Sequence, residues 1–461
     1  MIAPFYFSPF QDEVLLTNDA GCFIFLSKDN FHKLIKNEEN IDPTVLENLI
    51  EDGFCFTDSI ESYIRRNKDA VKDANGYLLN GTSLIILAVT NACNNRCVYC
   101  QANGKCESKI MSTEVAEMAL QRIKEMPAAE ITIEFQGGEP LLNFPVIRYV
   151  VERGEEVLHN KSVRYTVVSN LGLLTEEIAS FFAVHNVSVS TSLDGPSAVH
   201  NMNRPKSSGY GSYQETVNGI AFLRTHGIMP GAIQTTTSNS LSYAEQIVDE
   251  YVEHGFHQIF LRPLTRLGAA ARRWDQIGYD SQEFLAFYRK ALNRILEYNK
   301  RGYNLVEYHA ALFLTKILYG RSVNYMELRS PCGAGIGQIA ITANGTVYTC
   351  DEGRMMAEMG DEAFQIGNVF DSSYYEWLDS SCCQAVCSAS LLDLLPGCCD
   401  CVFKPYCGTC PVINYAIYGN ITHVSSERCK IYKGILTVLF EYIKVGNDEI
   451  MRIFEEWGKQ A

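Results

Sequence analysis

The sequence predicts an α/β fold centred on a partial (β/α)6 barrel of TIM type, and the main sign is a regular alternation of strands and helices. From residue 83 to about residue 300, short apolar runs alternate with amphipathic stretches of helical period, which is typical of a parallel sheet. Such barrels keep their chemistry at the carboxyl ends of the strands, and polar residues follow several of these runs. The predicted strands are residues 83–89, 130–135, 163–169, 187–193, 231–237 and 258–263.

Composition favours a globular protein of several domains. The 461 residues are 47% hydrophobic and 20% charged, and this length allows two or three separate cores. A net charge of −15 without a basic stripe argues against a nucleic-acid partner. No apolar run approaches the roughly 18 to 20 residues that cross a membrane, and the start at Met1 lacks the features of a signal peptide. We therefore expect a cytoplasmic protein with no membrane partner.

Residues 1–80 predict a small module of one hairpin and short helices in front of the barrel. Asp42 is suited to cap the second helix, because its carboxylate can accept bonds from the first free N–H groups. We expect Cys22 and Cys55 to be core residues of this module. The expected elements are strands at 13–18 and 22–26, a turn at 19–21, and helices at 28–36 and 43–52.

The barrel is expected to occupy residues 81–310, with its last helix at 280–300. A connector at 303–329 carries no clear pattern, and a cysteine-rich region follows at 311–430. Within it, Ala343-Asn344-Gly345 predicts the turn of a hairpin formed by 338–342 and 346–349. The tail, 431–461, predicts one amphipathic helix over 431–457.

Seventeen cysteines indicate metal binding, because clustered thiols in a reducing compartment rarely form disulfides. Cys93, Cys97 and Cys100 form a C-x3-C-x2-C loop directly after the first barrel strand. Three thiolates in one short loop can hold three corners of an iron-sulfur cube and leave one iron open. Two other interpretations of the loop stay open, a zinc site with four closed ligands and three unrelated buried thiols.

Together with Gly137-Gly138-Glu139-Pro140 after the second strand, this loop resembles the radical S-adenosylmethionine (SAM) superfamily. The resemblance implies a [4Fe-4S] cluster whose free iron chelates SAM and whose electron cleaves SAM to methionine and a 5′-deoxyadenosyl radical. In isolation, the glycine pair would indicate only a tight turn.

The same resemblance implies a set of SAM-binding residues. The two glycines would permit close backbone approach to the ligand, and Arg204 would pair with a carboxylate; alone, Arg204 would be a solvated charge. Asp194 has no assigned role. The implied set is Gly137, Gly138 and Glu139 near the methionine ammonium, Asn170 and Ser192 near the ribose or carboxylate, Arg204 on the carboxylate and Tyr99 beside the adenine.

Eleven of the cysteines lie between Cys332 and Cys429, in an order that resembles the SPASM extension of radical SAM enzymes. The resemblance implies two auxiliary four-iron clusters, one on Cys398, Cys401, Cys407 and Cys429, the other on Cys332, Cys350 and Cys410. The fourth ligand of the second cluster is open: Cys382, Cys383 or Cys387 could supply it, or the corner could be vacant and able to bind a substrate thiolate. Taken alone, the stretch from Cys398 to Cys410 would favour zinc.

Asp351 directly follows Cys350 and matches an acid that serves as proton acceptor in the sulfatase-maturating enzymes. Its alternative interpretation is an ordinary turn residue beside a cluster loop. Longer stretches, among them Glu134 to Phe144 and Gly353 to Asp361, resemble the maturases of His-Xaa-Ser repeat peptide systems. Residues 1–80 resemble winged-helix leader-binding domains, in which a leader peptide adds a strand to the hairpin edge.

The resemblance therefore implies an enzyme with three [4Fe-4S] clusters and SAM that modifies a ribosomal precursor peptide carrying a leader. It would abstract a hydrogen atom and form a crosslink, by thioether or carbon-carbon bond, with electrons from an external flavodoxin- or ferredoxin-type donor. Two alternatives are a formylglycine-forming sulfatase maturase and a zinc-stabilised peptide-binding scaffold.

Overall fold

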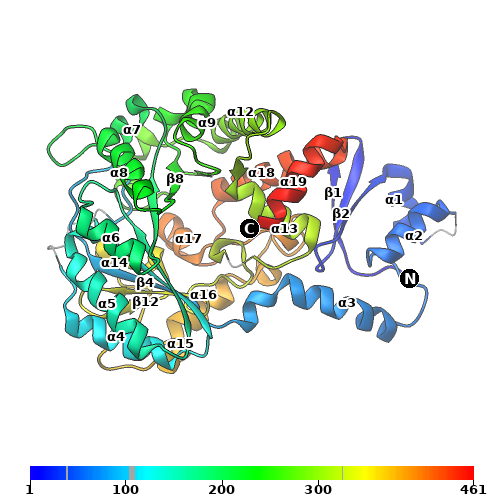
Figure 1. Cartoon of the computed structure of the whole chain (residues 1–461). Helices are drawn as coiled ribbons and strands as arrows, with labels where there is room; N and C mark the ends of the chain where they lie inside the picture. Colours follow the sequence, from blue (N-terminus) through cyan, green and yellow to red (C-terminus); the bar gives the residue numbers. More distant parts are fainter. Residues whose placement is uncertain (38–39, 103–108, 324, 461) are drawn as a thin grey trace.

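A computed structural model describes residues 1–37, 40–102, 109–323 and 325–460 of the chain. At its centre lies a ten-stranded sheet in the order β10-β9-β8-β7-β6-β5-β4-β11-β12-β13 (Figure 1). The six strands predicted for the barrel are confirmed, with boundaries shifted by one or two residues. They are β4 (Leu84–Thr90), β5 (Glu130–Gly137), β6 (Ser162–Val168), β7 (Ser188–Ser192), β8 (Gly231–Thr235) and β9 (Gln258–Arg262).

These six strands are parallel and each pairs with the next, so the sheet curves as a partial barrel. The barrel stays open because other strands extend both edges: β11 (Gln338–Thr342) pairs with β4, and β10 (Val306–Glu307) pairs with β9. The connecting helices are α4 (Thr113–Glu125), α5 (Phe144–Val157), α6 (Glu176–Val184), α7 (Ser197–Asn203), α8 (Tyr213–Thr225), α9 (Ala244–Glu253), α10 (Gly268–Arg272) and α11 (Trp274–Ile277).

Helix α12 (Ser281–Lys300) confirms the predicted last barrel helix. Asp280 caps it by accepting hydrogen bonds from the N–H groups of Gln282 and Glu283. The Glu283 carboxylate in turn accepts a hydrogen bond from the N–H of Asp280. The connector without a clear pattern contains β10 and α13 (Tyr308–Tyr319), and α13 is buried along most of its length.

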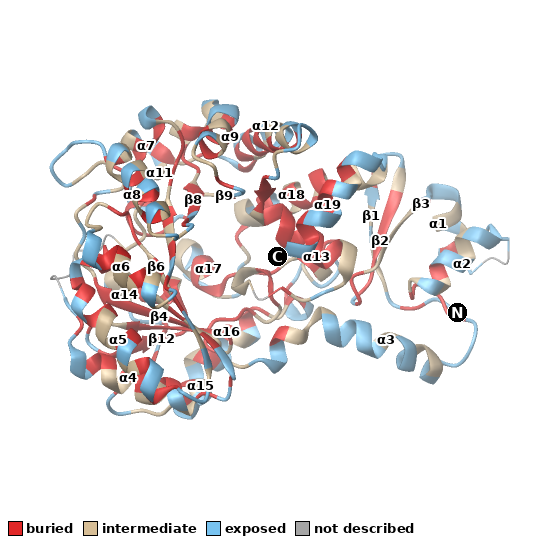
Figure 2. Ribbon diagram, in the orientation of Figure 1, coloured by how far each residue is buried: buried red, intermediate tan, exposed pale blue. Residues whose placement is uncertain are grey.

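The N-terminal module contains the predicted hairpin, β2 (Glu13–Thr17) and β3 (Phe23–Ser27), and a third strand that the sequence did not indicate, β1 (Tyr6–Phe10). The two predicted helices are α1 (Lys28–Ile35) and α2 (Pro43–Glu51), and Asp42 caps α2 as expected. The long helix α3 (Ile60–Ala74) then runs back toward the barrel with no buried residue, and its ribbon in Figure 2 is mostly pale blue.

The cysteine-rich region continues the central sheet and then turns helical. Its predicted hairpin is confirmed as β11 and β12 (Thr346–Tyr348), and β13 (Gln365–Asn368) pairs with β12. The helices are α14 (Asp351–Glu358), α15 (Tyr374–Asp379), α16 (Ser381–Ala389) and α17 (Pro411–Tyr418). Short 3-10 helices complete the chain: η1 (Gly76–Leu79), η2 (Pro140–Asn143), η3 (Ser238–Tyr243), η4 (Met326–Leu328), η5 (Leu392–Leu394) and η6 (Lys404–Tyr406).

The prediction of one tail helix is wrong, because the tail forms two helices, α18 (Ser426–Val445) and α19 (Asp448–Gln460). Gly446 adopts the left-handed conformation that ends a helix, with φ +65°, and the side chain of Asn447 accepts a bond from the N–H of Ile450. Phe440 of α18 packs against Phe23 of β3, with ring centroids 5.2 Å apart, so the tail joins the N-terminal module to the rest of the chain (Figure 1). No helix in the described ranges is both long and apolar enough to span a membrane.

Candidate active site at the carboxyl ends of the barrel strands

A cavity of about 200 Å³ lies at the carboxyl ends of the barrel strands. It is lined by every residue that the sequence assigned to SAM and its cluster: Cys93, Cys97, Tyr99, Cys100, Gly137, Gly138, Glu139, Asn170, Ser192 and Arg204. All of them except Arg204 lie at or just after the ends of β4, β5, β6 and β7, which meet because the strands are parallel and adjacent; Arg204 follows α7.

The glycine pair holds the cysteine loop against β5. The N–H of Gly138 donates to the carbonyl of Thr90, and the N–H of Glu139 donates to the carbonyl of Ala92, each at 2.8 Å. A Cβ atom at Gly137 would lie 1.8 Å from the Thr90 oxygen, and one at Gly138 would lie 2.1 Å from the Ala92 oxygen. The glycines are thus needed for contact between two backbone segments, a reason that the resemblance alone did not provide.

We expect Gly138→Ala to displace the cysteine loop, because the added methyl group would overlap the Ala92 carbonyl. The cost should be about 2 kcal/mol of folding free energy, with loss of iron from this loop. Chemical denaturation and iron analysis measure the two effects. Gly231→Ala is the matched control, since nothing lies within 4 Å of a Cβ there. Equal stability and iron content in the two variants would contradict the close contact.

Glu139 is a buried anchor among the strand ends. Its carboxylate accepts bonds from the Ser169 hydroxyl at 2.7 Å and from the N–H of Asn170 at 2.8 Å. Burial raises the pKa of Glu139, and these bonds oppose the rise. The Asn170 amide in turn donates to Asn94 at 2.7 Å, within the cysteine loop. Glu139 and Asn170 therefore fix the loop that carries Cys93 and still line the cavity.

Arg204, Tyr99 and Asp194 form a buried chain beside the cavity. The Tyr99 hydroxyl donates to Asp194 at 2.8 Å and accepts from Arg204 at 2.7 Å. Asp194, which the sequence left without a role, is thus the acceptor that orients Tyr99, although burial raises the pKa of its carboxyl. Among the described residues, the Nε of Arg204 is buried without a hydrogen-bond partner. This free donor in the cavity wall suits an anionic group such as the carboxylate of SAM.

The three loop thiols lie close enough to influence one another. Burial raises the pKa of Cys93 to about 11 and that of Cys100 to about 12, and the neighbouring thiols of the loop add to both shifts. Buried thiols that repel one another as thiolates are stabilised by a bound cation, as in an iron-sulfur cluster. The donor set of the cavity therefore fits a cluster together with SAM.

The quartet Cys398, Cys401, Cys407 and Cys429 also gathers around one small cavity. Burial raises the pKa of Cys407 to about 12, with contributions from the other three thiols. Lys433 lies one helical turn after Cys429 on α18 and hydrogen-bonds to Cys401. The arrangement gives four thiols and one ammonium group in a common site.

Cys332, Cys350 and Cys410 lie together in a second buried cluster of side chains. The Cys350 thiol begins α14 by accepting a bond from the N–H of Gly353 at 3.4 Å. Of the α16 cysteines, Cys383 and Cys387 hydrogen-bond to each other, and Cys382 donates to the Ala363 carbonyl at 3.3 Å. Within the described part of the chain, no three His, Cys, Asp or Glu side chains lie close enough to hold a single metal ion.

A larger cavity of about 740 Å³ fills the inside of the barrel, and each of the six barrel strands contributes to its wall. It adjoins the smaller cavity, because Gln136, Arg262 and Met355 line both. Asp351 lies in its wall, where Nε and Nη2 of Arg354 donate to one carboxylate oxygen at 2.8 and 2.6 Å. Sequence reasoning missed Glu134, Glu327 and Glu352 in the same wall, although a glutamate in an apolar strand, as Glu134 is, could have indicated an inward-facing charge.

Comparison with known proteins identifies the domain that contains the barrel strands. Residues 87–259 match the family model of the Radical SAM superfamily. The chain contains a radical SAM domain. An uncharacterized protein of Methanocaldococcus jannaschii is 32% identical over 182 residues, which are 40% of this chain and 63% of that protein. An uncharacterized protein of Methanothermobacter thermautotrophicus is 30% identical over 166 residues. The chain spans less than two thirds of the length of these two relatives.

Other similarities extend beyond the radical SAM domain. A cysteine-type anaerobic sulfatase-maturating enzyme of Clostridium perfringens is 23% identical over 65% of this chain and 80% of its own. The radical SAM cyclopropyl synthase TigE of Paramaledivibacter caminithermalis is 23% identical over 89% of this chain and 85% of its own. Among solved structures, anSMEcpe with bound AdoMet (SAM) has a TM-score of 0.69 at 19% identity, covering 82% of this chain and all of that one. SuiB of Streptococcus suis bound to its precursor peptide SuiA has a TM-score of 0.56 at 14% identity, covering 93% and 99%.

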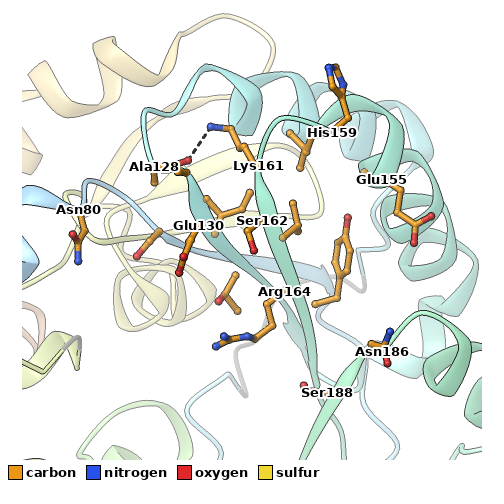
Figure 3. A pocket seen from close by; sticks show the side chains of 18 of the residues that line it. Asn80, Ala128, Glu130, Glu155, His159, Lys161, Ser162, Arg164, Asn186 and Ser188 are labelled. Carbon is orange, nitrogen blue, oxygen red and sulfur yellow. Dashed lines mark hydrogen bonds between the residues drawn. The ribbon is translucent and has the colours of Figure 1, made fainter.

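A further cavity, of about 1240 Å³, lies at the opposite end of the barrel strands. Figure 3 shows Glu130, Ser162 and Arg164 in its wall, from the starts of β5 and β6. Lys161 there donates to the carbonyl of Ala128 at 3.0 Å. None of the predicted site residues lines it, so volume alone does not mark the site.

We expect Arg204→Lys to weaken SAM binding by the radical SAM domain roughly tenfold or more, because an ammonium lacks the second donor of the guanidinium fork. Equilibrium dialysis of the reconstituted protein measures the dissociation constant. Arg148→Lys, on the outer helix α5 and paired with Glu177, is the matched control. Unchanged affinity in Arg204→Lys would exclude a direct role of the guanidinium.

Proposed function

We propose that this chain is a radical SAM enzyme that modifies a ribosomally made precursor peptide by hydrogen abstraction and oxidative crosslinking, through a thioether or a carbon-carbon bond. The observation that carries the proposal is the pair of adjoining cavities. One is lined by Cys93, Cys97, Cys100 and Arg204, and the other is lined by Asp351 and large enough for a substrate side chain. The similarity to a peptide-bound solved structure supports a peptide substrate.

Cys93, Cys97 and Cys100 would hold the SAM cluster, which supplies the open iron and the single electron that cleaves SAM. Arg204 would hold the carboxylate of SAM with its free Nε donor, and Ser192 would face the ribose or carboxylate. Tyr99 would lie beside the adenine, with its ring fixed by Asp194. The glycine pair and Glu139 would keep the loop and the strand ends in register while SAM binds.

Asp351 would accept the proton that the substrate loses, because it faces the cavity and Arg354 orients its carboxylate. The quartet Cys398, Cys401, Cys407 and Cys429 would hold one auxiliary cluster, and Cys332, Cys350 and Cys410 a second, as sites for the electron that the substrate gives up. An external flavodoxin- or ferredoxin-type donor would supply the electron for SAM cleavage. We place the enzyme in the cytoplasm, where its thiols stay reduced.

The module of residues 1–80 would bind the leader segment of the precursor. β1 already pairs with one edge of the predicted hairpin, so a leader strand would add at β3 or at the outer edge of β1. A second candidate function, formylglycine formation, is favoured by Asp351 beside Cys350 and by similarity to the sulfatase-maturating enzyme of Clostridium perfringens.

One experiment separates the two functions. The reconstituted protein is incubated anaerobically with SAM, dithionite and either a candidate precursor peptide that carries a leader or a cysteine-containing sulfatase peptide. Crosslinking predicts that the first peptide loses two hydrogen atoms per bond, in step with 5′-deoxyadenosine, and that the second is unchanged. An aldehyde formed only on the sulfatase peptide would favour the second function and contradict the proposal.

A further inference from the structure

The loop that carries Cys93 is bordered on two sides by exposed segments of the chain. On one side, the N–H of Lys109 donates to the side chain of Asn91 at 2.7 Å. On the other side, the N–H of Ser207 donates to the carbonyl of Asn94 at 2.9 Å. Cys93 lies between these two contacts and is the one exposed cysteine of the proposed SAM cluster triad. The two segments therefore frame the part of the loop where the triad comes nearest to solvent.

Three large apolar side chains are exposed in the segments beside this loop: Ile110 (62%), Leu142 (44%) and Tyr210 (76%). Ile110 and Leu142 lie in adjacent segments, because the side chain of Asn143 donates to the carbonyl of Met111 at 3.0 Å. Tyr210 lies across the loop, in the hairpin that borders its other side. Single exposed apolar residues are common, whereas several around one functional loop indicate an interaction surface.

The charge of this surface is opposite to that of the whole chain. Arg96 in the loop and Lys109 beside it are exposed. No carboxylate in the part of the chain that the structure describes forms an ion pair with either of them. Lys206 adds a third cation, which pairs with Glu215. Since the chain as a whole carries a net charge of −15, this excess of cations is local, and it would attract an acidic partner.

We propose, resting on the electron donor of the function proposed above, that the surface formed by Arg96, Lys109, Ile110, Leu142 and Tyr210 is the docking face for a flavodoxin. A flavodoxin is a small acidic protein whose flavin exposes an apolar edge. Its carboxylates would meet the two cations, and the flavin edge would meet the apolar side chains.

The reaction at this docking face is the transfer of one electron. The reduced flavodoxin loses the electron and the oxidised cluster gains it, and no covalent bond forms or breaks. None of the five residues of the docking face lines the SAM cavity or the larger cavity. The donor and the peptide substrate would therefore occupy separate parts of the protein, so the docking face can be altered without changing either cavity.

The test compares two reductants on the full, reconstituted chain with SAM. One is dithionite, a small molecule that needs no docking face, and the other is a purified flavodoxin with NADPH and its reductase. Changing Arg96→Glu together with Lys109→Glu should lower flavodoxin-driven formation of 5′-deoxyadenosine about tenfold or more at low ionic strength, because the opposite charge that steers the donor is lost. The dithionite-driven rate should stay at the parent value.

The matched control is Arg65→Glu with Lys68→Glu. Both residues are exposed on α3, and the pair makes the same change in net charge far from the cysteine loop in the sequence. Both rates of this control should equal those of the parent.

A measurement on the unaltered protein does not depend on how the variants fold. A carbodiimide joins carboxylates to lysine amines that they contact, and mass spectrometry of the digested product identifies the lysine. We expect the flavodoxin to be joined to Lys109, and added salt to reduce both this product and the flavodoxin-driven rate. A product at another lysine, such as Lys430 next to Cys429, with none at Lys109, would overturn the proposal.

Three kinetic results would also overturn it. They are a flavodoxin-driven rate that is equal in the charge-reversed and parent proteins, an equal loss of both rates in a charge-reversed protein that circular dichroism shows to be folded, and SAM cleavage that a ferredoxin supports and a flavodoxin does not. A parent that forms no 5′-deoxyadenosine with dithionite would instead contradict the proposed function itself.

Discussion

Replacing Cys93, Cys97 and Cys100 together by alanine should abolish formation of 5′-deoxyadenosine from SAM and dithionite. The three thiols line the same cavity as Arg204 and the glycine pair, so their removal should leave the cluster beside the SAM site without its protein ligands. Chromatography of the nucleoside products measures the effect, with loss to the level of a protein-free sample expected.

Cys22→Ala is the control for this experiment, because Cys22 is half-buried in the N-terminal module, outside the cavities that hold the proposed cluster ligands. It should cleave SAM at the parent rate. Circular dichroism should show that the triple variant is folded, since the loop follows the end of β4 and, of the three cysteines, Cys97 alone packs against the main hydrophobic core. Continued SAM cleavage by the folded triple variant would refute the assignment of the radical SAM cluster.

Replacing Cys398 and Cys401 by alanine should stop formation of the peptide product and spare part of the SAM cleavage. These thiols line a cavity that shares no residue with the SAM cavity, so they can be removed without altering the SAM site. The ratio of modified peptide to 5′-deoxyadenosine measures the uncoupling and should fall toward zero. Cys399→Ala, an exposed neighbour, should keep the parent ratio.

A Cys398/Cys401 variant that still couples each SAM cleavage to one peptide product would show that the quartet has no part in electron uptake. Loss of SAM cleavage to the level of the triple variant would instead show that the two sites are not independent. Iron analysis of the same samples, with a loss of about four irons expected, separates a removed cluster from an unfolded protein.

The barrel could be predicted from the sequence because parallel strands that are buried on both faces consist of short, nearly continuous runs of apolar residues. Leu84–Thr90 and Gln258–Arg262 are examples, and their neighbours in the sheet follow from the alternation with helices. β1 was missed because Pro9, one of its two exposed residues, interrupts the strand pattern. The break in the tail was missed because Gly446 ends one helix and Asn447 caps the next within a continuous amphipathic pattern.

The sequence could predict the site residues only where they belong to a short motif with a fixed spacing along the chain. The cysteine loop and the glycine pair are local in sequence, and they line one cavity. The hydrogen bond between Tyr99 and Arg204 joins residues 105 positions apart, and the bond between Tyr99 and Asp194 joins residues 95 positions apart. Such pairings arise from tertiary structure, so the sequence left Asp194 without a role.

The most direct test of the central claim is the electron paramagnetic resonance (EPR) spectrum of the anaerobically reconstituted, dithionite-reduced protein with and without SAM, with iron, zinc and sulfide counted on the same sample. We expect about 12 irons per chain and one cluster signal that changes when SAM is added and is absent from the Cys93/Cys97/Cys100 variant. Zinc at these three thiols, or a spectrum that SAM leaves unchanged, would contradict the account.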